Sequence, residues 1–188
     1  MKQVLIYSDI NNHSSEMMQL LKEIASENID KNLDYKLRRA ARTILFNQEE
    51  KVALLYVSKH DYHKIPGGAI KTDEDKLYSL RREVQEEIGV KELDIQDELG
   101  IIIEYRDGYD RYETGLIQVS YCYISYVNGE IGRPNFTKKE KELGLEVKWF
   151  SLEDAIEILE NDVSNIDYVN DFIIKRDLCF LKHALDSN

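Results

Sequence analysis

Three glutamates, Glu83, Glu86 and Glu87, lie close together in a stretch whose pattern is helical. At about 100° per residue, positions i, i+3 and i+4 share one face of a helix, so the three carboxylates are neighbours. Carboxylates crowded in this way repel one another in water. A divalent cation relieves that repulsion, and hard oxygen ligands suit Mg²⁺ or Mn²⁺. The spacing therefore predicts a metal-binding face, and the alternative is an acidic helix face that only meets water.

The glutamates belong to a longer pattern over residues 68–90, which reads GAIKTDEDKLYSLRREVQEEIGV. Gly68 is followed after five residues by Glu74, and after seven more by REVQEEIGV, which contains Gly89. This arrangement matches the Nudix box, G-x5-E-x7-R-E-U-x-E-E-x-G-U with U apolar, at every defined position. The chain therefore resembles a Nudix hydrolase, and the match favours the metal-binding interpretation over the solvated face.

A helix must hold these carboxylates in place, and the sequence contains signals for both of its ends. Thr72 and, three residues later, Asp75 have the form of a capping box, which predicts that the helix starts there. Residues 73–75 would then lie in the first turn, where the helix dipole favours negative charge. Gly89 predicts the end of the helix, because glycine takes the left-handed conformation that closes one. The apolar residues within roughly 80° of one another are Leu77, Leu80, Val84 and Ile88.

The resemblance to the family implies hydrolysis of a phosphoanhydride bond in a nucleoside diphosphate linked to another moiety. Bound Mg²⁺ polarises the phosphoryl group and acidifies a water molecule in such reactions. Arg82 would pair with one of the glutamates and hold its orientation, and Glu74 would support either the geometry of the loop and helix or the outer sphere of the metal. Gly67 and Gly68 would let the backbone approach the metal. The ligands that the family pattern implies are Glu83, Glu86, Glu87 and a main-chain carbonyl at Gly68.

The general base is not fixed by the box, because members of the family use a glutamate of the box or one on a loop elsewhere. Residues 133–144 form a predicted polar loop before the last predicted strand. Glu140 and Glu142 in this loop are candidates for the base or for an additional metal ligand. The alternative is that both lie in a solvated loop of mixed charge.

Candidates for substrate contacts come from cations and aromatic residues elsewhere in the chain. Arg38 and Arg42 should share one face of a predicted strand, opposite Arg39, and Arg42 is the candidate to bind a phosphate through two hydrogen bonds. Lys139 is a candidate to contact a phosphate, and its alternative is an exposed surface lysine. Tyrosines are common in strands and hairpins, but three of them are candidates to stack on a base. These are Tyr105, Tyr109 and Tyr112.

The composition restricts the classes of partner. The chain has 188 residues, 43% apolar and 32% charged, which suits a folded domain with a substantial core. Its net charge of −11 argues against nucleic acid as a partner and implies that an anionic substrate needs cations nearby. The apolar run at the N-terminus is too short for a membrane span, so no membrane partner is expected. Cys122 and Cys179 are too few for a disulfide framework and indicate a cytoplasmic protein.

Strand-like and amphipathic helical runs alternate along the chain, which predicts a mixed sheet between helical layers. The resemblance implies the same fold, a Nudix-type α/β/α sandwich with a mixed β-sheet, over about residues 36–160. Residues 1–34 are predicted to be an extension that covers a sheet edge or makes a homodimer contact, and residues 35–188 the Nudix domain. Predicted strands lie at residues 2–7, 38–46, 52–57, 99–105, 116–127 and 145–150, and further helices at 14–27, 151–159 and 167–185.

The sequence leaves three functions to compare. The leading prediction is Mg²⁺-dependent hydrolysis of a small nucleotide derivative, such as ADP-ribose, a nucleotide sugar or a modified nucleoside triphosphate, with Mn²⁺ as a second candidate metal. The alternative is a catalytically silent Nudix-fold module that senses a nucleotide, which would be expected to have lost carboxylates of the box. An isomerase of the isoprenoid type would need a catalytic cysteine, and neither Cys122 nor Cys179 is near the box in sequence.

Overall fold

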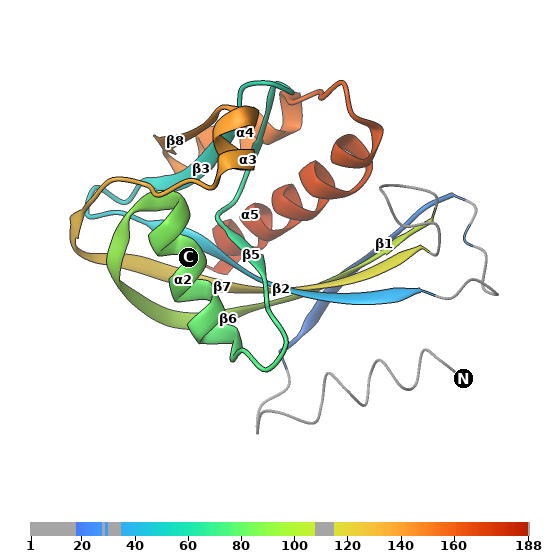
Figure 1. Cartoon of the computed structure of the whole chain (residues 1–188), viewed down its shortest axis with the longest axis horizontal. Helices are drawn as coiled ribbons and strands as arrows, with labels where there is room; N and C mark the ends of the chain where they lie inside the picture. Colours follow the sequence, from blue (N-terminus) through green and yellow to red (C-terminus); the bar gives the residue numbers. More distant parts are fainter. Residues whose placement is uncertain (1–17, 28, 30–34, 108–114, 188) are drawn as a thin grey trace.

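A mixed β-sheet runs through the centre of the computed structural model, which describes residues 18–27, 29, 35–107 and 115–187 (Figure 1). In this part of the chain the order of the strands is β1-β6-β7-β2-β3-β4, and β5 pairs with β2 while β8 pairs with β3. The strands are β1 (Leu20–Ala25), β2 (Lys36–Phe46), β3 (Val52–Val57), β4 (Tyr62–Lys64), β5 (Gly67–Ala69), β6 (Val90–Arg106), β7 (Leu116–Ile131) and β8 (Leu145–Phe150).

The strand β2 lies in the middle of the sheet and carries Arg38 and Arg42. It runs parallel to β7 along one edge, and its other edge is shared by antiparallel pairing with β3 and β5. The short pairing with β5 places Arg42 directly opposite Gly67. The predicted strand that carries the arginines and the pair Gly67 and Gly68 are therefore neighbours in the sheet.

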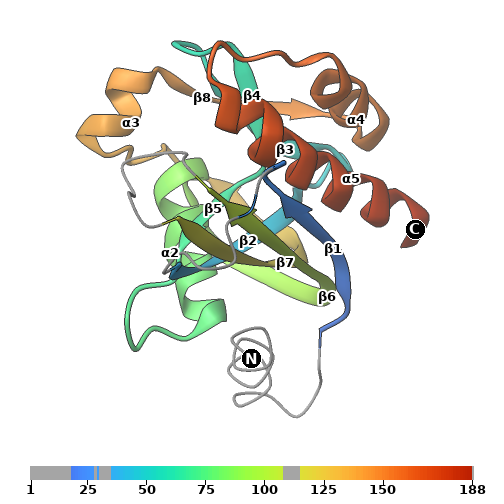
Figure 2. The same cartoon turned by 90° about the vertical axis from the view of Figure 1, so that its right-hand side faces the viewer.

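Helices cover both faces of the sheet (Figure 2). One face carries α2 (Lys76–Ile88), and the other carries α4 (Leu152–Asn161) and α5 (Lys175–Ser187), which continues a π-helical segment η1 (Val169–Ile174). A short helix α3 (Lys138–Leu143) precedes β8. The predicted α/β/α sandwich with a mixed sheet is confirmed.

Two hydrophobic cores result, one on each face of the sheet. Neighbouring residues of β2 serve different cores, since Ile44 packs among residues of α4 and α5 whereas Leu45 packs among residues of α2. This follows from the alternation of side chains along a strand. The side chains of α2 that enter its core are Leu80, Val84 and Ile88. Leu77, predicted to belong to the same stripe, is 39% exposed.

The prediction of a helix at residues 14–27 is wrong for residues 18–27, which the structure describes, because Leu20–Ala25 forms the strand β1. This strand runs parallel to β6, and Leu20 lies opposite Ile101. A Cβ added at Gly100 would come within 2.5 Å of the Leu21 side chain, so glycine permits the close approach of the two strands. The apolar spacing suited a helix, but pairing with a distant strand decided the outcome. The strand predicted at residues 2–7 lies outside the described residues.

Smaller differences concern the ends of elements. The strand β6 starts at Val90, immediately after α2, and not at the predicted residue 99. The predicted polar loop 133–144 contains α3, which starts with a capping box between Thr137 and Glu140. The predicted last helix is divided into η1 and α5. Of the helices in the described part of the chain, none combines the length and apolar character that crossing a bilayer requires.

Candidate active site

A cleft of about 620 Å³ opens between the sheet, α2, α3 and the start of α5. Gly67, Gly68 and two glutamates of the box line this cleft. The charged side chains among its lining residues are Arg38, Arg42, Lys64, Arg106, Lys139, Arg176, Glu83, Glu87 and Glu140.

The helix that carries the carboxylates begins later than predicted. Asp75, and not Thr72, is the N-cap, because its carboxylate accepts hydrogen bonds from the backbone N–H groups of Leu77 and Tyr78 at 2.9 and 3.1 Å. Residues 73–75 therefore precede the first turn and do not lie in it. The predicted end is confirmed, since Gly89 takes the left-handed conformation with φ of 89°.

The three glutamates differ in burial because α2 turns its stripe of Leu80, Val84 and Ile88 to the sheet. Glu87 is closest to that stripe and its side chain is 2% exposed. The exposed fractions of the side chains of Glu83 and Glu86 are 15% and 40%. The carboxylates thus become more exposed from Glu87 to Glu83 to Glu86, and Glu86 is not among the residues that line the cleft.

Glu87 is held on both of its oxygens. Lys64 donates from Nζ to Oε1 at 2.9 Å, and the backbone N–H of Gly67 donates to Oε2 at 2.8 Å. A buried carboxylate is costly unless it is paired, and these two donors supply the pairing. Lys64 lies on β4 and was not singled out in the sequence, although it stands only a few residues before Gly67.

Arg82 connects three acidic side chains. It makes two hydrogen bonds to Glu74, at 3.2 and 3.0 Å, and one from Nη1 to Glu83 Oε1 at 2.6 Å. Its Nη1 also lies 3.5 Å from Glu86 Oε2. The bonds from Arg82, together with one from Ser79, lower the pKa of Glu74 to about 2. Arg82 thus contacts Glu83, one of the glutamates with which it was predicted to pair.

The carboxylate oxygens of α2 are the kind of ligand that a hard divalent cation prefers. Burial raises the pKa of Glu83, and the charges of Glu87 and Glu86 raise it further. The hydrogen bond from Arg82 lowers this pKa but does not cancel the effect of burial. A Cβ added at Gly68 would lie 2.3 Å from Glu83 Oε2, so the backbone there comes directly against this carboxylate. Within the described residues, no three His, Cys, Asp or Glu side chains form a ready-made metal cage, and Arg82 and Lys64 hold two of the carboxylates instead.

The opposite wall of the cleft comes from β2. Arg38 and Arg42 line it, while Arg39 is exposed and does not, as their alternation along the strand predicts. Arg42 is only 5% exposed, and it donates to Gly67 O and Ser120 Oγ, both at 3.4 Å. Arg42 and the buried carboxylate of Glu87 therefore contact the same residue, because Arg42 donates to the carbonyl of Gly67 and Glu87 accepts from its N–H.

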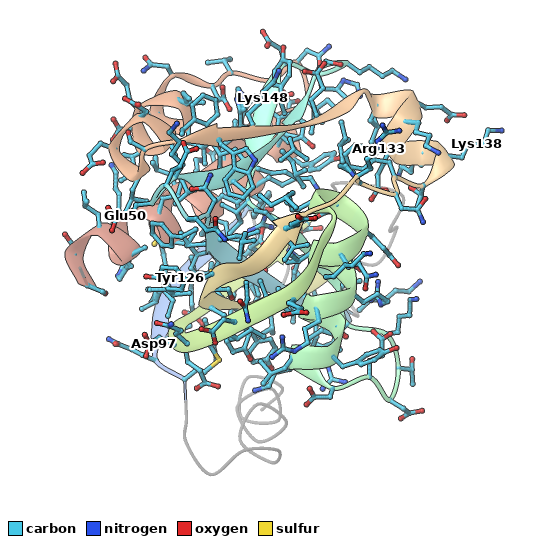
Figure 3. All side chains as sticks on the ribbon, turned by 90° about the vertical axis from the view of Figure 1, so that its left-hand side faces the viewer. Glu50, Asp97, Tyr126, Arg133, Lys138 and Lys148 are labelled. Atoms are coloured by element: carbon cyan, nitrogen blue, oxygen red, sulfur yellow. The ribbon has the colours of Figure 1, made fainter. Side chains whose placement is uncertain are left out.

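Of the two glutamates of α3 that are candidates for the general base, only Glu140 lines the cleft. Lys139 and Glu140 are among the lining residues, whereas Glu142 is not. The Glu142 side chain is 61% exposed and lies 3.9 Å from Lys138, which Figure 3 shows extending outward from α3. The Glu140 carboxylate accepts hydrogen bonds from the backbone N–H and the hydroxyl of Thr137 at 2.7 and 2.9 Å. As a candidate base, Glu140 is thus the better placed of the two.

Tyr105 is not among the residues that line the cleft, and its hydroxyl donates to Glu23 of β1 at 2.9 Å. Tyr109 and Tyr112 lie outside the described residues. The tyrosines that do line the cleft are Tyr62 and Tyr168, which were not singled out in the sequence.

A buried ionic cluster behind the cleft was also missed. Arg176 and Asp177 of α5 meet Glu104 and Arg106 of β6 there, and all four side chains are at most 4% exposed. A signal existed for Arg176, which stands four residues after Phe172 and four before Phe180 on the inner face of the predicted helix. A charged residue at that position must find a partner inside the protein.

Neither cysteine lies in the cleft. Cys122 is buried in β7, where burial raises the pKa of its thiol far above the usual value, and Cys179 is half-buried on α5. Thiol chemistry of the isomerase type has no residue to perform it among those that line the cleft.

Comparisons with known proteins identify a matching family model and several relatives. The family model described as NUDIX domain matches residues 36–172. Diphosphoinositol polyphosphate phosphohydrolase 2 of Rattus norvegicus is 28% identical over 127 residues, and the match covers 67% of this chain and 64% of that protein. The human protein of the same name is also 28% identical, and 63% of it is covered. The chain thus spans less than two thirds of the length of these relatives.

Several solved structures share the fold at low sequence identity. The MutT protein from Methanosarcina mazei Go1 has a TM-score of 0.53 and 18% identity, with 84% of this chain and 99% of that chain covered. The Ap4A hydrolase of C. elegans has a TM-score of 0.53 and 17% identity, with 81% and 98% covered. The NUDIX domain of Shewanella oneidensis NrtR, solved with ADP ribose, has a TM-score of 0.53 and 18% identity, with 85% and 94% covered.

Proposed function

Because the chain belongs to the Nudix hydrolase family, we propose that it hydrolyses a phosphoanhydride bond with a divalent metal ion, Mg²⁺ first and Mn²⁺ as a substitute. The observation that carries the proposal is the position of Gly67 and Gly68. These two residues stand between the carboxylates of Glu83 and Glu87 on one side and Arg42 on the other. A phosphate in the cleft would meet metal ligands and a cationic wall together.

The carboxylates of α2 would hold the metal, namely Glu83, Glu86 and Glu87, with a main-chain carbonyl at Gly68. When bound, such an ion neutralises phosphate charge and lowers the pKa of a coordinated water. Arg82 would fix the orientation of Glu83, to which it donates at 2.6 Å. Glu140 lies in the cleft wall and is the proposed general base. It would take a proton once its carboxylate leaves the hydrogen bonds of Thr137.

The proposed substrate is a small derivative of a nucleoside diphosphate, such as ADP-ribose, a nucleotide sugar or a modified nucleoside triphosphate. A second class, diphosphorylated inositol phosphates, follows from the names of the relatives. The cleft favours anionic compounds in either class, because its cationic side chains outnumber its acidic ones. Both cysteines are free, which suits the expected cytoplasmic location. A homodimer also stays an expectation.

A panel of these compounds, assayed with Mg²⁺ and with a chelator and followed by product identification, tests the proposal. We expect at least one compound to be split at its phosphoanhydride only when the metal is present. Replacing Glu86 by Gln should lower kcat/KM by about 100-fold or more, because a metal-supported step loses a ligand. The control is Glu153→Gln, an exposed glutamate in the first turn of α4, which should leave turnover unchanged.

Two outcomes would contradict the proposal. One is the absence of hydrolysis across the whole panel, and binding without turnover would then favour the sensing module. The other is hydrolysis that survives the chelator and the Glu86→Gln change, since the carboxylates would then have no part in the reaction.

A further inference from the structure

Among the described residues, the buried charges at the floor of the cleft are three arginines and three carboxylates, and one of these carboxylates, Glu87, is already paired with Lys64. Three arginines, Arg42, Arg106 and Arg176, are 5%, 3% and 1% exposed. The carboxylates buried beside them are Glu104 and Asp177, both 0% exposed. An uncompensated charge in such surroundings is costly, so the extra cation calls for an anion.

Both carboxylates are already held by other groups. Asp177 accepts from Arg176 Nε at 2.7 Å and from the backbone N–H of Ile65 at 3.0 Å. The side chains that donate to Glu104 at 2.8, 2.6 and 3.3 Å are those of Arg106, Gln118 and Arg176. Of the three arginines, Arg106 and Arg176 therefore have ion-pair partners in the cluster.

Arg42 is the arginine that the cluster does not neutralise. In the described part of the chain, no carboxylate oxygen lies within ion-pair distance of its guanidinium, and its two hydrogen bonds go to neutral oxygens at 3.4 Å. Bonds between an arginine and an anion are usually about 2.7–2.9 Å long. Burial and the nearby charge of Arg176 also lower the pKa of Arg42 to about 10. This guanidinium is poorly satisfied and lines the cleft.

We propose that Arg42 is the centre of a preformed anion site that binds a phosphate group of the substrate without any metal. The proposal rests on the proposed function and specifies how the same cleft takes its substrate. Arg42 contacts the carbonyl of Gly67 while Glu87 accepts from the N–H of the same residue. A phosphate on Arg42 is therefore held beside the carboxylates of α2 before a metal arrives.

The C-terminal helix contributes to this site although it lies beyond residue 172, where the family match ends. Arg176 forms ion pairs with Asp177 and Glu104, the two carboxylates whose charges also act on Arg42. A purely structural tie between α5 and the sheet explains the pairing of Arg176, but it does not explain why Arg42 is buried against neutral oxygens. The anion site explains both.

Titration with inorganic phosphate in the presence of EDTA tests the site separately from catalysis. Binding is followed by calorimetry and by the shift in thermal midpoint, against chloride at the same ionic strength. We expect wild type to bind phosphate and Arg42→Gln to bind it at least about tenfold more weakly, because a two-point charged contact is lost. The matched control is Arg39→Gln, on the same strand but exposed and outside the cleft, which should bind like wild type.

The design distinguishes failure of the site from failure of the proposed function. Glu86→Gln should lose hydrolysis and keep phosphate binding, whereas Arg42→Gln should lose phosphate binding. If Arg42→Gln does not fold, Arg42→Lys replaces it, and weaker phosphate binding than in Arg39→Gln supports the site. No phosphate binding by wild type, or equal affinities in the Arg42 and Arg39 variants, would overturn the proposal even if the enzyme hydrolyses its substrate.

Discussion

The guanidinium of Arg82 holds Glu74 through two hydrogen bonds, Nε to Oε1 at 3.2 Å and Nη2 to Oε2 at 3.0 Å. Glu74 lies in the loop before α2, whereas Arg82 lies in the middle of the helix. The remaining nitrogen of Arg82 donates to Glu83, a proposed metal ligand. Arg82 therefore connects Glu74, in the loop that follows Gly68, to the carboxylate of Glu83 in the cleft.

Replacing Arg82 by Lys keeps the charge and removes the planar fork that reaches both glutamates. We expect metal affinity or kcat/KM to fall by about 10–100-fold, the usual cost of losing a residue that orients a ligand. Metal titration by calorimetry together with steady-state kinetics measures both quantities. Arg81→Lys is the control, because Arg81 is exposed and donates to the backbone carbonyl of Leu93. Equal behaviour of the two variants would contradict the orienting role.

Glu74 should make the fold sensitive to acid. Its pKa is lowered from 4.5 to about 2 in the folded protein, first by the hydrogen bond from Arg82 and then by that from Ser79. A carboxyl with a depressed pKa contributes stability that is present above pH 4.5 and is lost as the pH falls toward 2. Urea midpoints between pH 2 and 7 should therefore decline less steeply in Glu74→Gln than in wild type. Parallel declines would show that the interaction does not contribute.

Lys64 should matter most to the protein without metal. Its removal in Lys64→Met leaves the buried carboxylate of Glu87 with only the N–H of Gly67 as donor. We expect the free energy of unfolding in EDTA to drop by roughly 1–3 kcal/mol, the cost of an undercompensated buried acceptor. Saturating Mg²⁺ should restore most of the loss, because a cation then replaces the ammonium group. The same destabilisation with and without Mg²⁺ would be evidence against a metal at Glu87.

Gly67 and Gly68 should respond differently to replacement by alanine. At Gly67 a Cβ would lie 2.3 Å from the backbone oxygen of Ala41, and φ is 125°, so Gly67→Ala should destabilise the fold by more than about 1 kcal/mol. At Gly68 the Cβ would meet only the end of the Glu83 side chain, which can turn away. Gly68→Ala should therefore fold normally and lose activity. Thermal unfolding and kinetics separate the two effects, and the reverse pattern would contradict this assignment.

The short-range features of the site were predictable from the sequence. The box placed three carboxylates on one face of a helix, and Gly89 ended that helix as expected. The alternation along β2 put Arg42 on the cleft side and Arg39 outside. These features depend on residues a few positions apart, so local spacing is sufficient to predict them.

The features that depend on distant contacts could not be predicted. The strand β1 exists because it pairs with β6, about eighty residues later, and its apolar spacing alone also suited a helix. Lys64 and Glu87 meet only after β4 is placed against α2. Arg176 was the exception, since its position between Phe172 and Phe180 marked a charge on a buried face. The start of α2 was predicted three residues too early, because Thr72 and Asp75 are both residue types that cap helices and Asp75 is the N-cap.

The most direct test is a crystal of the protein soaked in Mn²⁺ and measured at a wavelength where manganese scatters anomalously. We expect an anomalous peak between the carboxylates of Glu83, Glu86 and Glu87 and the backbone at Gly68, and no such peak in Glu86→Gln soaked in the same way. If the wild-type map shows no peak at these glutamates while Lys64 still holds Glu87, the central claim that α2 binds the catalytic metal is contradicted.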